Sequence, residues 1–275
     1  MQLKEKNHPS GNVVWPIIFA LLCLALAGRP LKASDENETI PGGTILPVRL
    51  NSTLSSSKSK PGQIITGRIM QDVPLPTGAV IRAGSKVLGH IVAVTPATGG
   101  ESVRISLKFD KLISANRVIP VTTDIRAIAS FMTVLEAQTP TSGPGEGDVY
   151  DWLPTVQVGG DAVYGLGGPV TSGDNPNEVV GRAVYGGVLS RVRAKEGEKC
   201  RGAINGDDHP QALWVFSSDS CGTYNLQHLS IMHAGRTDPT GLIVVASSTR
   251  KLKIPEGAGM LLRVVASNQS LNASR

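Results

Sequence analysis

Charge is scarce in this 275-residue sequence, because Asp, Glu, Lys and Arg together make up only 18 % of it. That share is too low for a coiled coil, whereas a hydrophobic content of 40 % is too high for a disordered protein. The excess of one sign is also small. A net charge of +5 is scattered along the chain and forms no footprint for nucleic acid. The length and composition allow one large β domain or two ordinary domains.

Long hydrophobic runs are rare as well, and the clearest is the N-terminal run 13–27 (VVWPIIFALLCLALA). It is shorter than the roughly 20 residues of a membrane span and has the length of a signal-peptide core. Lys4 and Lys6 precede it, and Ala25 and Ala27 are the small residues that a signal peptidase reads. We therefore expect residues 1–27 to be a signal peptide, with an uncleaved N-terminal anchor as the alternative. The mature chain is expected to have no transmembrane span.

Cysteine is nearly absent, with three in the whole sequence. Removal of the signal peptide takes Cys23 and leaves Cys200 and Cys221. In an oxidising compartment these two residues can form a disulfide, which would add about 3 kcal/mol by closing the loop between them. The alternative is two separate buried thiols.

Glycine and proline are abundant, at 31 and 18 residues, and they divide the sequence into short β runs. The predicted fold class is all-β: a compact, partly open β-barrel with a Gly-rich inserted region and one short helix. The expected parts are a flexible leader (28–39), the N-terminal part of the barrel (40–126), the short helix with the Gly-rich insertion (127–206), C-terminal strands that complete the barrel (207–266) and a tail (267–275).

The strongest strand signal is a hairpin with arms 87–94 and 103–109. In the second arm Val103, Ile105, Leu107 and Phe109 alternate with polar residues, so one face should pack on a core and the other should meet water. Two other segments carry specific expectations. Pro47 within the run 45–50 predicts an edge position or a bulge, and residues 127–137 (AIASFMTVLEA) predict a helix too short to cross a membrane.

One local pattern occurs three times, at 40–43, 81–84 and 254–257. In each copy an isoleucine is followed three residues later by glycine, then by a small residue and an apolar run. Glycine at that point suits the left-handed position of a bulged β-corner. The spacings are too uneven for a solenoid, so the pattern predicts a recurrent corner of one barrel.

Residues 40–94 carry a resemblance to a known family, in the segments IPGGTILPVRL, LSSSKSKPGQIITGRI and GAVIRAGSKVLGHIVAV. They resemble the TrbI-type β-barrel domain of the outer-membrane channel subunit of type IV secretion and conjugation systems. The later segments QALWVFSSDSCGTYNLQHLSIMHAGRTDP and IPEGAGMLLRV are similar to an uncharacterised family of exported bacterial proteins. The inner-membrane helix, Pro-rich linker and long helical pair of the channel subunit have no counterpart here. The resemblance therefore implies a barrel in the cell envelope rather than a pore.

Motifs of catalysis are missing: there is neither a G-x-S-x-G nucleophile elbow nor a phosphate-binding glycine loop. The weak candidates for a metal site are Asp208, His209, His233 and Asp238, whose oxygen and imidazole ligands nothing local brings together. A hydrolase using Ser218, Asp219 and His233 has no more support, since any Ser-rich chain offers such triples. No cofactor is predicted.

Aromatic residues give one candidate ligand surface, Tyr150 and Trp152 in the Gly-rich region, whereas Trp214 and Phe216 are expected to fill a core. The function predicted is an exported, non-enzymatic cell-envelope protein, a structural or interaction module whose partner is an envelope protein or a glycan. It would lie in the periplasm, be associated with the outer membrane or be secreted. The alternatives are a carbohydrate- or peptide-binding module that uses the Gly-rich region and a metal-assisted hydrolase.

Overall fold

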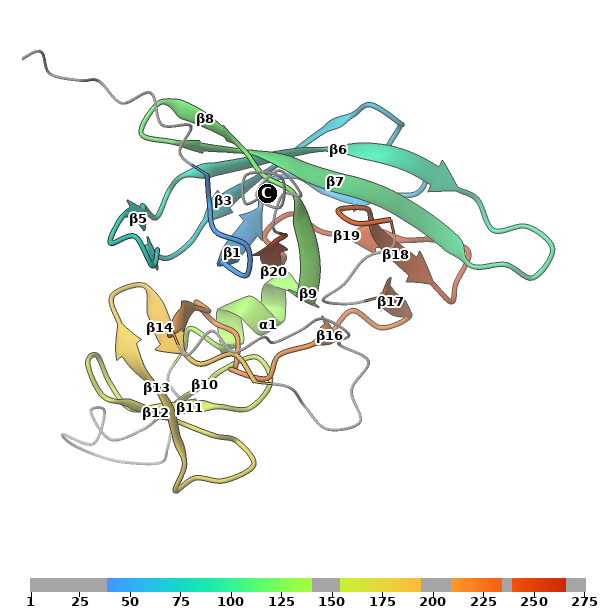
Figure 1. Ribbon diagram of the computed structural model, residues 1–275. Coiled ribbons are helices and arrows are strands. Elements are labelled where there is room, and N and C mark those ends of the chain that lie inside the picture. Colours follow the sequence, from blue (N-terminus) through green and yellow to red (C-terminus); the bar gives the residue numbers. More distant parts are fainter. Residues whose placement is uncertain (1–38, 140–153, 194–208, 234–238, 266–275) are drawn as a thin grey trace, which may run out of the picture. The chain divides into compact units, whose positions relative to one another are not determined.

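The computed structural model describes residues 39–139, 154–193, 209–233 and 239–265 (Figure 1). The predicted fold class is confirmed: the described chain is almost all strand, with a nearly closed barrel-shaped sheet and one short helix, α1 (Phe131–Glu136). Among the described residues, no helix is long and apolar enough to cross a membrane.

A ten-stranded sheet forms the barrel, in the order β16-β9-β20-β1-β3-β6-β7-β18-β17, with β8 pairing β7. Its strands are β1 (Ile45–Leu50), β3 (Ile64–Ile69), β6 (Lys86–Thr95), β7 (Val103–Ser114), β8 (Arg117–Pro120), β9 (Thr123–Ala129), β16 (Gly222–Tyr224), β17 (Leu229–Met232), β18 (Ile243–Ser247) and β20 (Gly259–Val264). The two ends of this order, β16 and β17, are consecutive strands, and the Thr223 hydroxyl donates to the Leu229 carbonyl at 3.0 Å. This contact brings the ends of the sheet together.

A second, smaller sheet has six strands that follow one another in sequence order. Five come from the Gly-rich region, and the last comes from the segment 207–266, so that strand does not complete the barrel as predicted. The six strands are β10 (Thr155–Val156), β11 (Ala162–Val163), β12 (Pro169–Thr171), β13 (Val179–Val184), β14 (Gly187–Ser190) and β15 (Gln211–Ala212). Two short ladders complete the fold, β2 (Leu54–Ser55) with β19 (Lys253–Ile254) and β4 (Val73–Pro74) with β5 (Val80–Ile81). The predicted short strands of this region are thus paired into a sheet.

Two hydrophobic cores follow from this arrangement. The barrel core contains the inward residues of its strands, including Val103, Ile105, Leu107 and Phe109 of the predicted hairpin, so that alternation is confirmed. The second core lies between the outer face of β1, β9 and β20 and the small sheet with α1. Trp214 (3 % exposed) and Phe216 (0 %) belong to it, as predicted.

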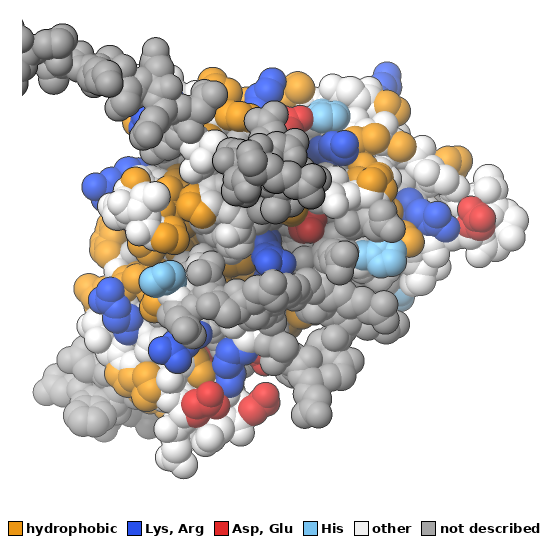
Figure 2. Space-filling model, viewed as in Figure 1, with side chains coloured by type: hydrophobic (Ala, Val, Ile, Leu, Met, Phe, Trp, Pro, Cys, Tyr) orange, Lys and Arg blue, Asp and Glu red, His pale blue; other side chains and the backbone are white. Residues whose placement is uncertain are grey.

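The outer face of β3, β6, β7 and β8 has no such cover among the described residues. Its outward positions are half-buried or exposed in every strand. Figure 2 shows basic and hydrophobic side chains side by side at the top of the view, where Figure 1 places β6, β7 and β8.

All three predicted β-corners have left-handed glycines, with φ of 93° at Gly43, 89° at Gly84 and 84° at Gly257. Each glycine N–H donates at 2.8 Å to the carbonyl of a neighbouring strand end, at Val264, Ile69 and Leu50 respectively.

A fourth corner has the same geometry. Gly62 has φ of 79° and donates to the Ile91 carbonyl at 2.8 Å. The sequence pattern missed it because Ser59 stands where the other copies have isoleucine. The four corners join two antiparallel pairs reciprocally, β1 with β20 and β3 with β6.

The expectation of an edge position for Pro47 is wrong, since β1 lies between β20 and β3. The pairing with β3 covers only Val48 to Leu50, and the Pro47 carbonyl accepts from the Met70 N–H at 3.0 Å, just past the end of β3. The amide position of a strand residue faces the same neighbour as its carbonyl. The missing proline N–H therefore falls where the ladder with β3 ends, so it costs only the terminal bond and leaves the pairing of Val48 to Leu50 intact.

The prediction of a helix over 127–137 is wrong at its N-terminal end. Residues Ala127 to Ala129 belong to β9 and pair with β20 on one side and β16 on the other. Pairing on both sides outweighs the helix propensity of alanine. The helix starts only at Phe131, where the Ser130 hydroxyl caps it by accepting the Thr133 N–H at 3.2 Å.

Candidate functional site

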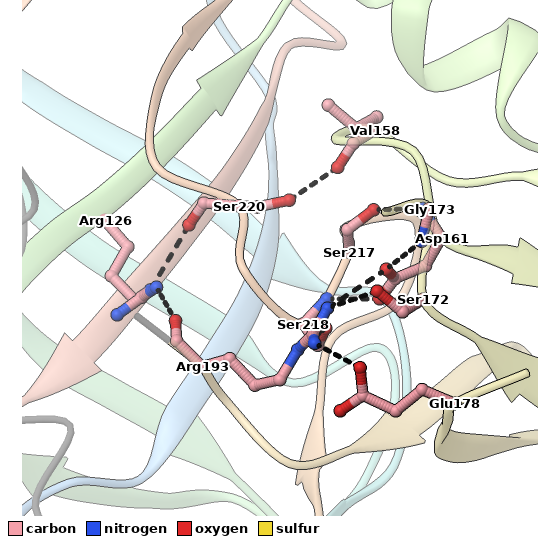
Figure 3. A network of polar contacts seen from close by, with 10 residues as sticks. All are labelled: Arg126, Val158, Asp161, Ser172, Gly173, Glu178, Arg193, Ser217, Ser218 and Ser220. Carbon is pink, nitrogen blue, oxygen red and sulfur yellow. Dashed lines mark hydrogen bonds and ion pairs between the residues drawn. The ribbon is translucent and has the colours of Figure 1, made fainter. Parts of the chain in front are cut away.

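A buried polar network connects the small sheet to the segment 217–220 (SSDS), as Figure 3 shows. The Asp161 carboxylate accepts from the Ser218 N–H at 2.7 Å and from the Gly173 N–H at 3.2 Å. The Asp161 N–H in turn donates to the Ser217 hydroxyl at 2.9 Å. The carboxylate thus satisfies backbone donors of two loops that lie far apart in the sequence.

Arg193 lies at the rim of this network (Figure 3). Its guanidinium donates to the hydroxyls of Ser218 and Ser172, both at 2.9 Å, and to the Glu178 carboxylate at 3.2 Å. The same group lies 3.8 Å from the Asp161 carboxylate. A planar guanidinium with several donors suits such a junction, because it holds three elements in one geometry.

The network extends to the barrel through Arg126 on β9, which donates to the carbonyls of Ser220 and Arg193 at 3.3 and 3.2 Å. Burial, and secondly the nearby Arg263, lower the pKa of the Arg126 guanidinium to about 10. Arg126 remains charged at neutral pH, so the contact between the layers includes a buried cation.

The serine hydroxyls of the SSDS segment make hydrogen bonds that hold the structure together, so none of the three is placed as a nucleophile. Ser217 and Ser218 accept the hydrogen bonds described above, and the Ser220 hydroxyl donates to the Val158 carbonyl. A serine nucleophile needs a base as its hydrogen-bond partner, whereas Ser218 faces a guanidinium. The geometry therefore gives no support to a hydrolase built on Ser218.

Two cavities flank the turn that joins β13 to β14. One, of 350 Å³, is lined by Leu166, Val184 and Trp214 together with the residues that follow α1. The other, of 420 Å³, lies between that turn and the segment 70–83 and is mostly apolar, with Met70, Val80 and Leu189 in its walls. Val184 and Gly186 border both cavities, so the two hollows belong to one region of the surface.

Large apolar side chains are exposed around these cavities. Tyr185, at the tip of the β13–β14 turn, is 90 % exposed, and Leu166 in the β11–β12 turn is 76 % exposed. The helix α1 adds Phe131, Met132 and Leu135, each about half exposed. We call Leu166, Tyr185 and the two cavities beside them the docking face. Clustered apolar exposure of this kind is typical of interaction surfaces.

The predicted ligand residues Tyr150 and Trp152 lie outside the described residues, as do Cys200, Asp208 and Asp238. Cys221 is half-buried after the SSDS segment. The disulfide therefore stays a prediction.

His209 is exposed and lines a third cavity of 240 Å³ with Arg182, beside β15, whereas His233 follows β17 of the barrel. Within the described part of the chain no three metal-ligating residues converge. With Asp208 and Asp238 outside that part, the metal site also stays a prediction.

The predicted ligand residues and the docking face both belong to the Gly-rich region, but sequence reasoning did not predict the exposure of Tyr185 and Leu166. Each sits next to glycines of a turn, in YGG (185–187) and GLGG (165–168). A large apolar residue at the tip of a tight turn has little to pack against, and that was the available signal.

Comparison of the chain with models of known protein families gives no match, and comparison with curated proteins gives none either.

Proposed function

We propose that this is an exported, non-enzymatic protein of the cell envelope that binds a partner protein through the docking face. The observation that carries the proposal is the exposure of Tyr185 and Leu166 beside two apolar cavities. The predicted signal peptide and the resemblance to TrbI-type barrels support a place in the periplasm or at the outer membrane. The buried serine, aspartate and arginine side chains are engaged in structural hydrogen bonds and ion pairs, and this supports a role without catalysis.

Recognition on such a face follows ordinary interface physics. An apolar side chain of the partner enters a cavity beside the β13–β14 turn, and Tyr185 covers it. Tyrosine brings a large contact area at the cost of only two side-chain torsions, which is why it is common among the residues that dominate binding energy. Because Tyr185 is held by a two-stranded turn, little backbone ordering is needed on binding.

Site-specific photocrosslinking in cells that export the protein tests this proposal. A crosslinker at position 185 is expected to yield an adduct with one defined envelope protein, and the yield should fall several-fold in the Leu166→Ser background. Val179, 64 % exposed on the same sheet but outside both cavities, is the matched control position. Equal adducts at 179 and 185, or none at 185, would contradict the proposal.

A glycan is the alternative ligand for the same region, favoured by the exposure of both Tyr164 and Tyr185. Together with Tyr150 and Trp152 they would form a stacking platform. Glycan-array binding that is lost on Trp152→Ala would support this alternative, whereas an array without signal would remove it. The metal-assisted hydrolase is tested by metal analysis of the purified protein, where stoichiometric Zn, Ca or Mn is the result it requires.

A further inference from the structure

Three basic residues stand directly opposite one another on three adjacent strands. Arg49 of β1 pairs with Arg68 of β3, and Arg68 pairs with Lys86 of β6. All three side chains are exposed. Directly opposite residues of antiparallel strands point to the same face, and neighbouring strands lie about 4.8 Å apart. The result is a row of three cations on the outer side of β1, β3 and β6, which continues onto the uncovered face of the barrel, here called the open face.

Such a row is unfavourable in the isolated protein, because like charges directly opposite each other destabilise a sheet. Within the described residues, no carboxylate forms an ion pair with Arg49, Arg68 or Lys86. Two acidic residues of this part of the chain have other partners. Asp72 pairs with Arg82 at 2.7 Å, and Asp110 pairs with His90 at 2.9 Å. The positive charge of the row therefore has no counterion among the described residues and can attract an anionic partner outside the barrel.

The same row continues into aliphatic residues. Lys86 pairs with Ile113 of β7, and Ile113 pairs with Val118 of β8, which is 62 % exposed. In the next row Leu88 pairs with Lys111. Further along, Ile64 is 64 % exposed and lies opposite His90. Cations thus lie beside aliphatic side chains, and the outward positions of β3, β6, β7 and β8 hold no Phe, Tyr or Trp ring on which a base or a sugar would stack. The one outward imidazole on these strands, His90, contacts Asp110.

We propose that this face docks on a membrane surface rich in anionic phospholipid. Arg49, Arg68 and Lys86, with Lys111 beside them, meet the lipid phosphates, and Val118 and Ile64 contact the boundary of the acyl region. Each cation near an anionic bilayer contributes about 1 kcal/mol, and exposed aliphatic groups favour a lipid boundary over a soluble polyanion. The inference does not rest on the docking face, since it uses different strands and different chemistry.

Vesicle binding of the exported full chain tests the proposal. Cosedimentation is measured with phosphatidylglycerol-containing vesicles and with neutral phosphatidylcholine vesicles. Binding through the apolar N-terminal segment would not depend on lipid charge and would appear with the neutral vesicles as well. We expect binding to the anionic vesicles alone, weakening as salt rises, because the screening length is about 8 Å at physiological ionic strength.

Charge variants locate the site. Arg68→Gln with Lys86→Gln should weaken partitioning about 30-fold, since two cations are removed and 1.4 kcal/mol is tenfold. The matched control, Arg250→Gln with Lys251→Gln, removes two exposed charges beyond β18. It should stay within about twofold, because β18 pairs with the other end of β7, roughly 30 Å along that strand from Ile113. Val118→Ser with Ile64→Ser should also weaken binding to the anionic vesicles.

Four results would overturn the proposal. The first is no binding to anionic vesicles, and the second is equal binding to neutral and anionic vesicles. The third is an equal loss of vesicle binding in the Arg68/Lys86 and Arg250/Lys251 variants. The fourth is binding to a soluble polyanion such as polygalacturonate without binding to vesicles. The last result would assign the face to an acidic polymer. Thermal midpoints of the variants that are no lower than that of the wild type show that any loss of binding is not a loss of fold. The crosslinking at position 185 is scored separately, so failure of one proposal leaves the other intact.

Discussion

The Gln71 side chain acts as part of the backbone pairing between the barrel and the small sheet. Its amide oxygen accepts the N–H groups of Trp214 at 2.7 Å and Val188 at 3.2 Å, and its amide nitrogen donates to the Val188 carbonyl at 2.8 Å. All of these groups are buried, so Gln71→Leu removes the acceptor of the Trp214 and Val188 N–H groups, whereas the Val188 carbonyl keeps its bond from the Leu213 N–H at 3.1 Å. We expect a loss of about 3 kcal/mol or more in the free energy of unfolding, measured by urea denaturation.

Gln63 provides the control for this change. Its side-chain oxygen accepts the Lys60 N–H at 3.1 Å at an exposed site, where water replaces the lost partner. Gln63→Leu should cost less than about 0.5 kcal/mol. If both variants lose the same stability, the role assigned to Gln71 is wrong.

Asp72 makes stability depend on pH in a defined direction. The Ala83 N–H is the largest influence on the pKa of its carboxyl and lowers it; burial opposes this, and the Arg82 guanidinium lowers the pKa further, so that it lies below the ordinary value of 3.8. A lowered pKa in the folded state stabilises the protein above the unfolded value, and this contribution disappears as pH falls through the folded pKa. The difference in thermal midpoint between wild type and Asp72→Asn should therefore be constant near neutrality and vanish below pH 3.8. Asp174→Asn, at an exposed site, is the control. A difference that persists undiminished at pH 2 contradicts this assignment.

At the scale of elements, the β-corners explain why glycine recurs before the strands. Gly84 has positive φ and open space where a Cβ would lie, so Gly84→Ala tests the backbone alone and should cost about 1 kcal/mol. Gly257→Ala adds contact with the Phe131 ring, 2.5 Å from the new Cβ, and should cost more. Chemical denaturation measures both. Gly84→Asn, which tolerates left-handed backbone, should recover part of the loss. An alanine variant as stable as wild type would exclude strain at the corner.

The same elements show what sequence alone predicts. Local rules suffice for the corners and for the alternation of Val103 to Phe109, because a positive φ and a two-sided strand leave a direct trace in residue choice. They fail at Pro47 and at Ala127, where the outcome depends on which strand lies alongside. The sequence of a strand does not specify which strands pair with it, so strand order and the end of a ladder cannot be predicted from local rules.

The candidate site was predictable only as a region. The glycine turns predicted surface loops, but the exposure of Tyr185 depends on how the small sheet packs against the barrel through Trp214 and Phe216. The cationic row depends still more on register. Arg49, Arg68 and Lys86 are 19 and 18 residues apart, and only the strand pairing brings them into one line.

For the molecule as a whole, one side of the barrel sheet is used for internal packing and another is left open. The outer face of β1, β9 and β20 is covered by α1 and the small sheet and is fixed by Arg126, Gln71 and Gln211, whose side-chain oxygen accepts the Ile45 N–H at 3.1 Å. The face of β3, β6, β7 and β8 has exposed cations in place of a second layer. The polar groups named here are thus matched to one another, whereas Arg68 and Lys86 of the open face have no ion-pair partner among the described residues.

This difference predicts a mutation that stabilises the molecule while impairing its proposed membrane contact. Arg68→Thr removes the central cation of the row and introduces a good strand former, so the free energy of unfolding should rise by about 0.5 kcal/mol. The thermal midpoint should then rise by about 1–2 °C in low salt, and the gain should shrink as salt screens the row. Arg104→Thr is the control, because Arg104 lies opposite Thr95 rather than a cation, so it should lack the salt-dependent part of the gain. A lower midpoint for Arg68→Thr would mean that the row stabilises the fold, and the unmatched charge would then need no external partner.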